Sequence, residues 1–67
     1  MARREIEAGQ KFQQPGARSV WVVVDLLDDA EGIQHARIRR DDDETSVKMI
    51  SVSALKDGRL YRLLDDE

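Results

Sequence analysis

The residues best able to do chemistry lie in a basic segment, residues 33–40, which contains the only histidine and three arginines. Alternate side chains of an extended strand share one face, so His35, Arg37 and Arg39 should point the same way. A lysine and the single tryptophan could join them from neighbouring strands. Arginine beside an exposed aromatic ring can contact phosphates and stack on nucleic-acid bases. The candidate binding surface therefore comprises Trp21, His35, Arg37, Arg39, Arg40 and Lys48.

A solvated strand face is the competing interpretation of this basic segment. Its arginines would then pair with the acidic loops at 28–31 and 41–44, and exposed pairs of that kind contribute little to stability. The net charge of −3 and the isoelectric point of about 5.1 support this interpretation. Domains that bind nucleic acid are usually basic. The sequence thus favours the solvated face.

The other reactive residue types form no recognisable catalytic or metal site. A general base at His35 would lack a partner, and the chain has no cysteine nucleophile. The acidic run at 41–44 lacks the spacing of a calcium loop and is typical of a hairpin tip. Three aromatic residues are too few for a groove that binds Pro-rich peptides. We therefore predict no catalytic residue, no cofactor and no metal.

Residues 20–27, the most apolar stretch of the chain, must position the candidate surface. Their β-branched valines favour an extended backbone. Alternation assigns Val20, Val22, Val24 and Leu26 to one face, and Trp21, Val23, Asp25 and Leu27 to the other. Because the first face is uniformly apolar, we expect it to line the core and Trp21 to be partly exposed. An exposed Trp21 beside Val23 and Leu27 would form an apolar patch that invites a partner.

The remaining pattern predicts an all-β domain with one short helical turn. We expect further strands at 9–12, 33–40, 45–52 and 60–64, hairpin loops at 28–32 and 41–44, and a helical turn at 53–58. Consecutive apolar residues at Met49 and Ile50 indicate either two partly buried faces or a β-bulge. Ser51 or Ser53 can cap the helical turn, and Gly58 can end it.

The length of 67 residues predicts one domain. We divide it into a flexible N-terminal segment at 1–8, a folded β-barrel at 9–64 and an acidic tail at 65–67. No stretch approaches the roughly 20 apolar residues of a membrane span, and no apolar run follows the Arg3-Arg4 pair as in a signal peptide. A cytoplasmic protein is the expected result.

Five short antiparallel strands with one helical turn before the last is the order found in SH3-like small barrels. Motifs spread over residues 9–64 also resemble a family of small uncharacterised bacterial proteins with that fold. They are Gly-x-x-Phe at 9–12, the Pro15-Gly16 turn, Trp-x-Val at 21–23, Ile-Ser-x-x-x-Leu-x-Asp at 50–57, and Tyr61. The resemblance implies the fold and brings no function, which a fold alone does not determine.

These observations predict a non-enzymatic interaction module that binds another protein or a second copy of itself. The contact would use an edge strand or the surface around Trp21. The alternative is a nucleic-acid-binding small β-barrel that uses Trp21, Arg37, Arg39, Arg40 and Lys48. A membrane partner is not expected.

Overall fold

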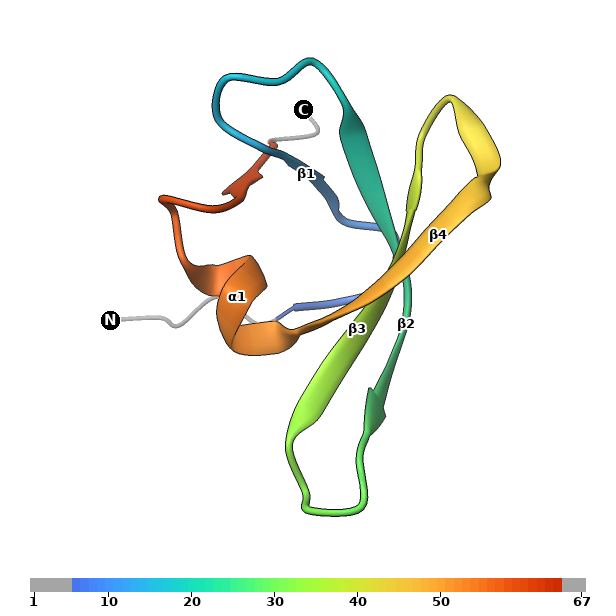
Figure 1. The fold of residues 1–67 in the computed structure, drawn as a ribbon, viewed down its shortest axis with the longest axis vertical. Helices are drawn as coiled ribbons and strands as arrows, with labels where there is room; N and C mark the ends of the chain where they lie inside the picture. Colours follow the sequence, from blue (N-terminus) through green and yellow to red (C-terminus); the bar gives the residue numbers. More distant parts are fainter. Residues whose placement is uncertain (1–5, 65–67) are drawn as a thin grey trace.

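The computed structural model describes residues 6–64, which form five antiparallel strands and one short helix (Figure 1). In chain order the elements are β1 (Lys11–Gln13), β2 (Val20–Asp28), β3 (Gln34–Arg40), β4 (Asp43–Ser51), α1 (Val52–Lys56) and β5 (Arg62–Leu63). The strands are ordered β4-β3-β2-β1-β5 in one sheet. The predicted all-β class, with a short helix before the last strand, is confirmed.

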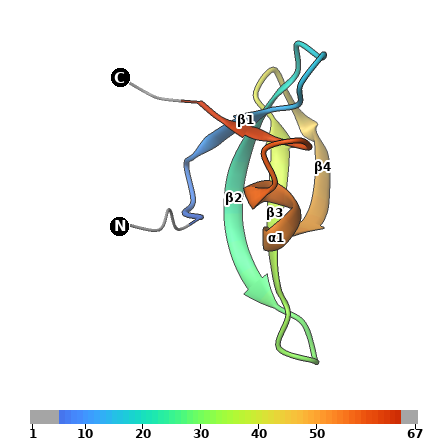
Figure 2. The same cartoon turned by 90° about the vertical axis from the view of Figure 1, so that its left-hand side faces the viewer.

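The sheet is open, because β4 and β5 are its two edges and do not pair with each other. The word barrel therefore describes the fold only loosely. The three long strands β2, β3 and β4 form a curved layer, and α1 and β5 lie over one side of it (Figure 2). We call that side the inner face and the opposite side the outer face.

The core fills the space between the inner face, α1 and β5. Its buried side chains are Ile6, Phe12, Trp21, Val23, Ala36, Ile38, Val52, Leu55 and Tyr61. Ile6, a member of this cluster, lies within the segment at 1–8 for which we predicted flexibility. Residues 1–5 and the tail at 65–67 lie outside the described residues.

The predicted phase of β2 is wrong in its first half. Trp21 and Val23 are buried, whereas Val24 is exposed. The reason is a β-bulge between Val23 and Asp25, where the register with β3 shifts. A bulge adds one residue to one strand and reverses which later side chains face the core. Leu26 therefore packs against the same core as Val23, although the two residues are three apart.

The strand irregularity predicted at Met49 and Ile50 lies elsewhere. Arg39 pairs with Val47 and Arg40 pairs with Asp43, so residues 44–46 of β4 have no partner on β3. The Asp43 carboxylate stabilises this bulge by accepting hydrogen bonds from the backbone N–H and hydroxyl of Thr45, at 3.1 and 2.7 Å, and from the Ser46 hydroxyl, at 3.0 Å. From Val47 onward β4 alternates regularly.

Two local predictions about turns and caps are confirmed. Gly16 has a φ of 82°, as a turn after Pro15 requires. The Ser51 hydroxyl accepts a hydrogen bond from the Ala54 N–H at 3.2 Å and caps α1. The helix ends at Lys56 rather than at Gly58, because the backbone of the C-cap residue Asp57 is extended; the Asp57 N–H donates to the Ala54 carbonyl.

Candidate functional site

The structure divides the predicted binding surface between the two faces of the sheet. Ala36 and Ile38 are fully buried on the inner face, so the alternate residues of β3 lie on the outer face. The outer set is His35, Arg37 and Arg39, and the inner set is Trp21, Arg40 and Lys48. One contiguous surface of all six residues does not exist.

The outer face consists of cross-strand rows that mix apolar and charged side chains. One row joins Val22, Arg39 and Val47 across β2, β3 and β4, and the next joins Asp25, Arg37 and Met49. Val24 projects beside them at the bulge of β2. Its exposed fraction is 40%, and the fractions for Val47 and Met49 are 49% and 50%. Val24, Val47 and Met49, which we call the apolar strip, lie on β2 and β4 on either side of the charged residues of β3.

The charged centre of the outer face is a two-point ion pair between Arg37 and Asp25. Arg37 Nε donates to Asp25 Oδ1 at 3.0 Å, and Arg37 Nη2 donates to Asp25 Oδ2 at 2.5 Å. The hydrogen bonds from Arg37 lower the pKa of the Asp25 carboxyl, and the same bonds raise the pKa of Arg37. The expected pairing of the arginines with the acidic loops holds for Arg40, which pairs with Asp42, whereas Arg37 pairs with Asp25 of β2. Its charge is locally neutralised.

His35 lies at the end of the outer face beside the β2–β3 loop. Its Nδ1 lies 3.1 Å from the Ile33 carbonyl and 4.0 Å from Asp29 Oδ2. The Asp29 carboxylate accepts the backbone N–H groups of Ile33 and Glu31, and these bonds lower its pKa. Asp29 therefore organises the loop, and His35 packs against a structural carboxylate.

The edge strand β4 carries features that discourage pairing with another strand. The Val23 carbonyl accepts the Gly9 N–H and the Val23 N–H donates to the Gln10 carbonyl, so the backbone groups of the neighbouring Val22 point towards β3. The same alternation continues from strand to strand. The backbone N–H and carbonyl of Lys48 therefore point towards β3, and those of Val47 and Met49 point towards the free edge of the sheet. The bulge at 44–46 and an inward-pointing lysine are common protections of such edges. The geometry thus favours the outer face over the edge as a contact surface.

On the inner face, Lys48 covers the aromatic rings of the core. Its Nζ lies 4.5 Å from the centre of the Trp21 ring and 5.7 Å from that of Tyr61. Trp21 is only 9% exposed. The expectation that Trp21 is partly exposed is wrong, because the bulge in β2 turns it inward. Its ring is not available to stack on a nucleic-acid base.

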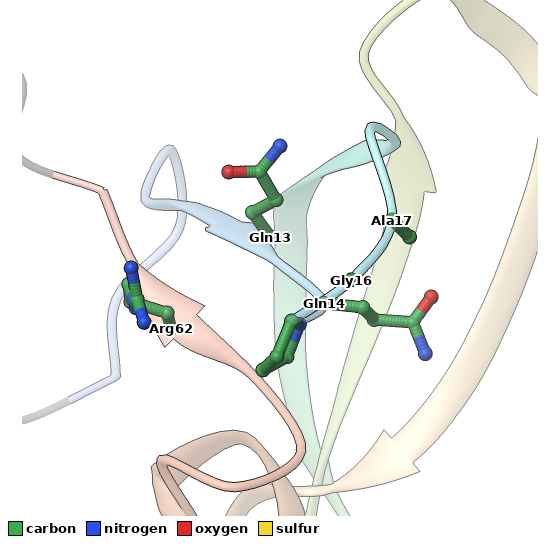
Figure 3. A pocket seen from close by; sticks show the side chains of 6 residues that line it. Gln13, Gln14, Gly16, Ala17 and Arg62 are labelled. Carbon is green, nitrogen blue, oxygen red and sulfur yellow. The ribbon is translucent and has the colours of Figure 1, made fainter.

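A hollow between the β1–β2 turn and β5 is a feature that sequence reasoning missed (Figure 3). Its volume is about 160 Å³, below the roughly 300 Å³ at which ligand pockets begin. Gln13 and Arg62 face each other across β1 and β5. Figure 3 shows the side chains of Gln13, Gln14 and Arg62 pointing in different directions. They do not converge on one ligand. No motif in the sequence could have signalled a hollow formed by a turn and a distant strand.

Two absences apply to residues 6–64. Within this range no three acidic or histidine side chains lie close enough together to hold a metal ion. The only helix described is far too short to cross a membrane.

Comparison with known proteins gave no match to this chain, whether by family models, curated sequences or solved structures. The resemblance to the bacterial family with an SH3-like barrel stays a prediction.

Proposed function

We propose that this protein is a small, non-enzymatic interaction module of the cytoplasm, and that the outer face of β2, β3 and β4 is its contact surface. The observation that supports this is the apolar strip of Val24, Val47 and Met49, about half exposed and surrounding an ion pair. Met and Arg are enriched at protein interfaces.

Protein is a better ligand than nucleic acid for this surface. Arg37 is already bonded to Asp25, and Trp21 lies in the core on the other face. The outer rows lack an aromatic ring for stacking. Salt-sensitive binding of single-stranded RNA that is lost when Arg37 and Arg39 become Glu would overturn this choice.

The partner we propose is a second copy of the chain. The outer face carries both signs of charge beside its apolar side chains, so it can be complementary to itself about a two-fold axis. Among residues 6–64, the one hydrogen bond of the Arg39 side chain goes to the Arg40 carbonyl, at 3.3 Å, and its cation can face the Asp25 carboxylate of the second copy. Binding to a different protein is the competing outcome.

Sedimentation over a wide concentration range tests this proposal. The wild-type mass should rise from 7.7 kDa towards twice that value. Met49→Glu places a charge within the apolar strip and should keep the protein monomeric. Leu60→Glu is the matched control, because Leu60 is equally exposed at 50% but lies in the turn after α1. A wild-type protein that stays monomeric at millimolar concentration would exclude a second copy of the chain as the partner. Equal effects of the two substitutions on the mass would exclude the outer face as the contact surface.

A further inference from the structure

Three nitrogen-bearing side chains gather at one end of the inner face. Trp21 and Arg40 are direct partners across β2 and β3. Lys48 follows on β4, paired with Ile38, and its Nζ lies over the Trp21 ring. The inner position of all three places two cations beside an indole N–H. All three groups donate hydrogen bonds and accept none.

Two buried donors of this cluster, Trp21 Nε1 and Arg40 Nε, lack a hydrogen bond within the described part of the chain. Trp21 Nε1 is buried and has no hydrogen-bond partner there. A buried N–H without an acceptor costs free energy, so such groups usually have one. Arg40 Nε is also buried without a hydrogen bond, although Asp42 Oδ1 lies 3.2 Å away. Among residues 6–64, no carboxylate lies within ion-pair distance of Lys48.

Asp42 and Asp43 are the carboxylates beside Arg40, and neither completes the cluster. Arg40 Nη2 donates to Asp42 Oδ2 at 3.3 Å, a long bond to a side chain that is 73% exposed. Asp43 is the partner of Arg40 on β4, and the charge of Arg40 helps to lower its pKa, but its oxygens accept hydrogen bonds from Thr45 and Ser46. Lys48 is therefore the cation of the cluster that has no carboxylate partner among residues 6–64.

We infer that Trp21, Arg40 and Lys48 form a binding site for an oxyanion, either a carboxylate or a phosphate group. Oxyanions bring several acceptor atoms, and charge-assisted bonds to Arg and Lys are stronger than neutral ones. An oxygen that displaces the side chains covering the buried Trp21 N–H would satisfy this donor. This site lies on the opposite face from the proposed protein contact, so the two proposals stand or fall separately.

The single tryptophan of the chain makes the site directly observable. We would titrate ¹⁵N-labelled full-length protein with inorganic phosphate, and separately with acetate, at constant ionic strength set by sodium chloride. The one indole N–H resonance should shift downfield and saturate, together with the amides of Arg40 and Lys48. Saturation by phosphate alone assigns a phosphate group, and saturation by acetate alone assigns a carboxylate.

Matched variants separate this site from general charge attraction. Lys48→Gln and Arg40→Gln should each weaken binding about tenfold, because each removes one charge-assisted bond. Lys56→Gln removes one positive charge from the exposed end of α1 and should leave the affinity unchanged. Arg40→Gln serves as the second variant if loss of Lys48 disturbs the core.

Three results would overturn the inference. One is an indole resonance unmoved by both anions at tens of millimolar, which would leave water as the only occupant of the site. Another is an equal loss of affinity in Lys56→Gln. The third is a shift that sodium chloride alone reproduces.

Discussion

The Lys48 ammonium lies 4.5 Å above the centre of the Trp21 ring, on the inner face of the sheet. A cation in this position is attracted by the ring's negative face. The contact connects β4, an edge strand, to the centre of the core. It also explains how a lysine can lie beside buried aromatic residues without a carboxylate partner.

Removing this cation should destabilise the fold. We expect Lys48→Met to lower the free energy of unfolding by about 0.5–1 kcal/mol, because Met keeps the aliphatic cover of the ring but loses the charge. Urea unfolding followed by Trp21 fluorescence measures the change. Lys56→Met is the control, since Lys56 is an exposed lysine at the end of α1. An equal effect in both variants would mean that the ring contact adds no stability.

The phase of β2 can be tested by a pair of matched truncations. Val23→Ala should cost about 2 kcal/mol in unfolding free energy, because Val23 is only 1% exposed and its methyl groups leave a cavity. Val24→Ala should cost less than about 0.5 kcal/mol, because its side chain is already in solvent. Chemical denaturation of the two variants measures the difference. A larger loss of stability in Val24→Ala than in Val23→Ala would indicate that β2 alternates regularly and would exclude the bulge.

Acid should weaken the β3–β4 hairpin through Asp43. Hydrogen bonds from the Thr45 hydroxyl and N–H, and from the Ser46 hydroxyl, lower the pKa of Asp43 below its ordinary value. The unfolded chain therefore takes up the proton first, at about pH 4. The stability from this carboxylate is fully present above that pH and is lost as the pH falls through the lower folded-state pKa.

The urea midpoint should accordingly fall between pH 6 and pH 3, and Asp43→Asn should make that fall smaller. Glu44→Gln is the control, because its carboxylate takes no part in these bonds. Asp25, Asp29 and Asp57 also have lowered pKa values, from bonds to Arg37, Ile33 and Arg59 respectively, so part of the acid sensitivity should remain. A pH dependence identical in wild type and Asp43→Asn would contradict the role of Asp43.

The chain of 67 residues determined its secondary structure through local physics. Valine-rich alternation, the Pro15-Gly16 turn and the Ser51 cap depend on neighbours in sequence, so the strands and the short helix could be predicted within a few residues. The inner position of Ala36 and Ile38 followed from the same alternation. These preferences need no knowledge of the tertiary fold.

Tertiary structure alone decided which residues meet at the candidate sites. One bulged residue near Val24 reverses the faces of β2, and nothing in its local sequence marks the register of a neighbouring strand. That reversal buries Trp21, brings Lys48 over its ring and leaves Arg37 on the other side of the sheet. The candidate residues could be named from their chemistry, but their grouping depends on long-range strand pairing, which the order of residues does not reveal.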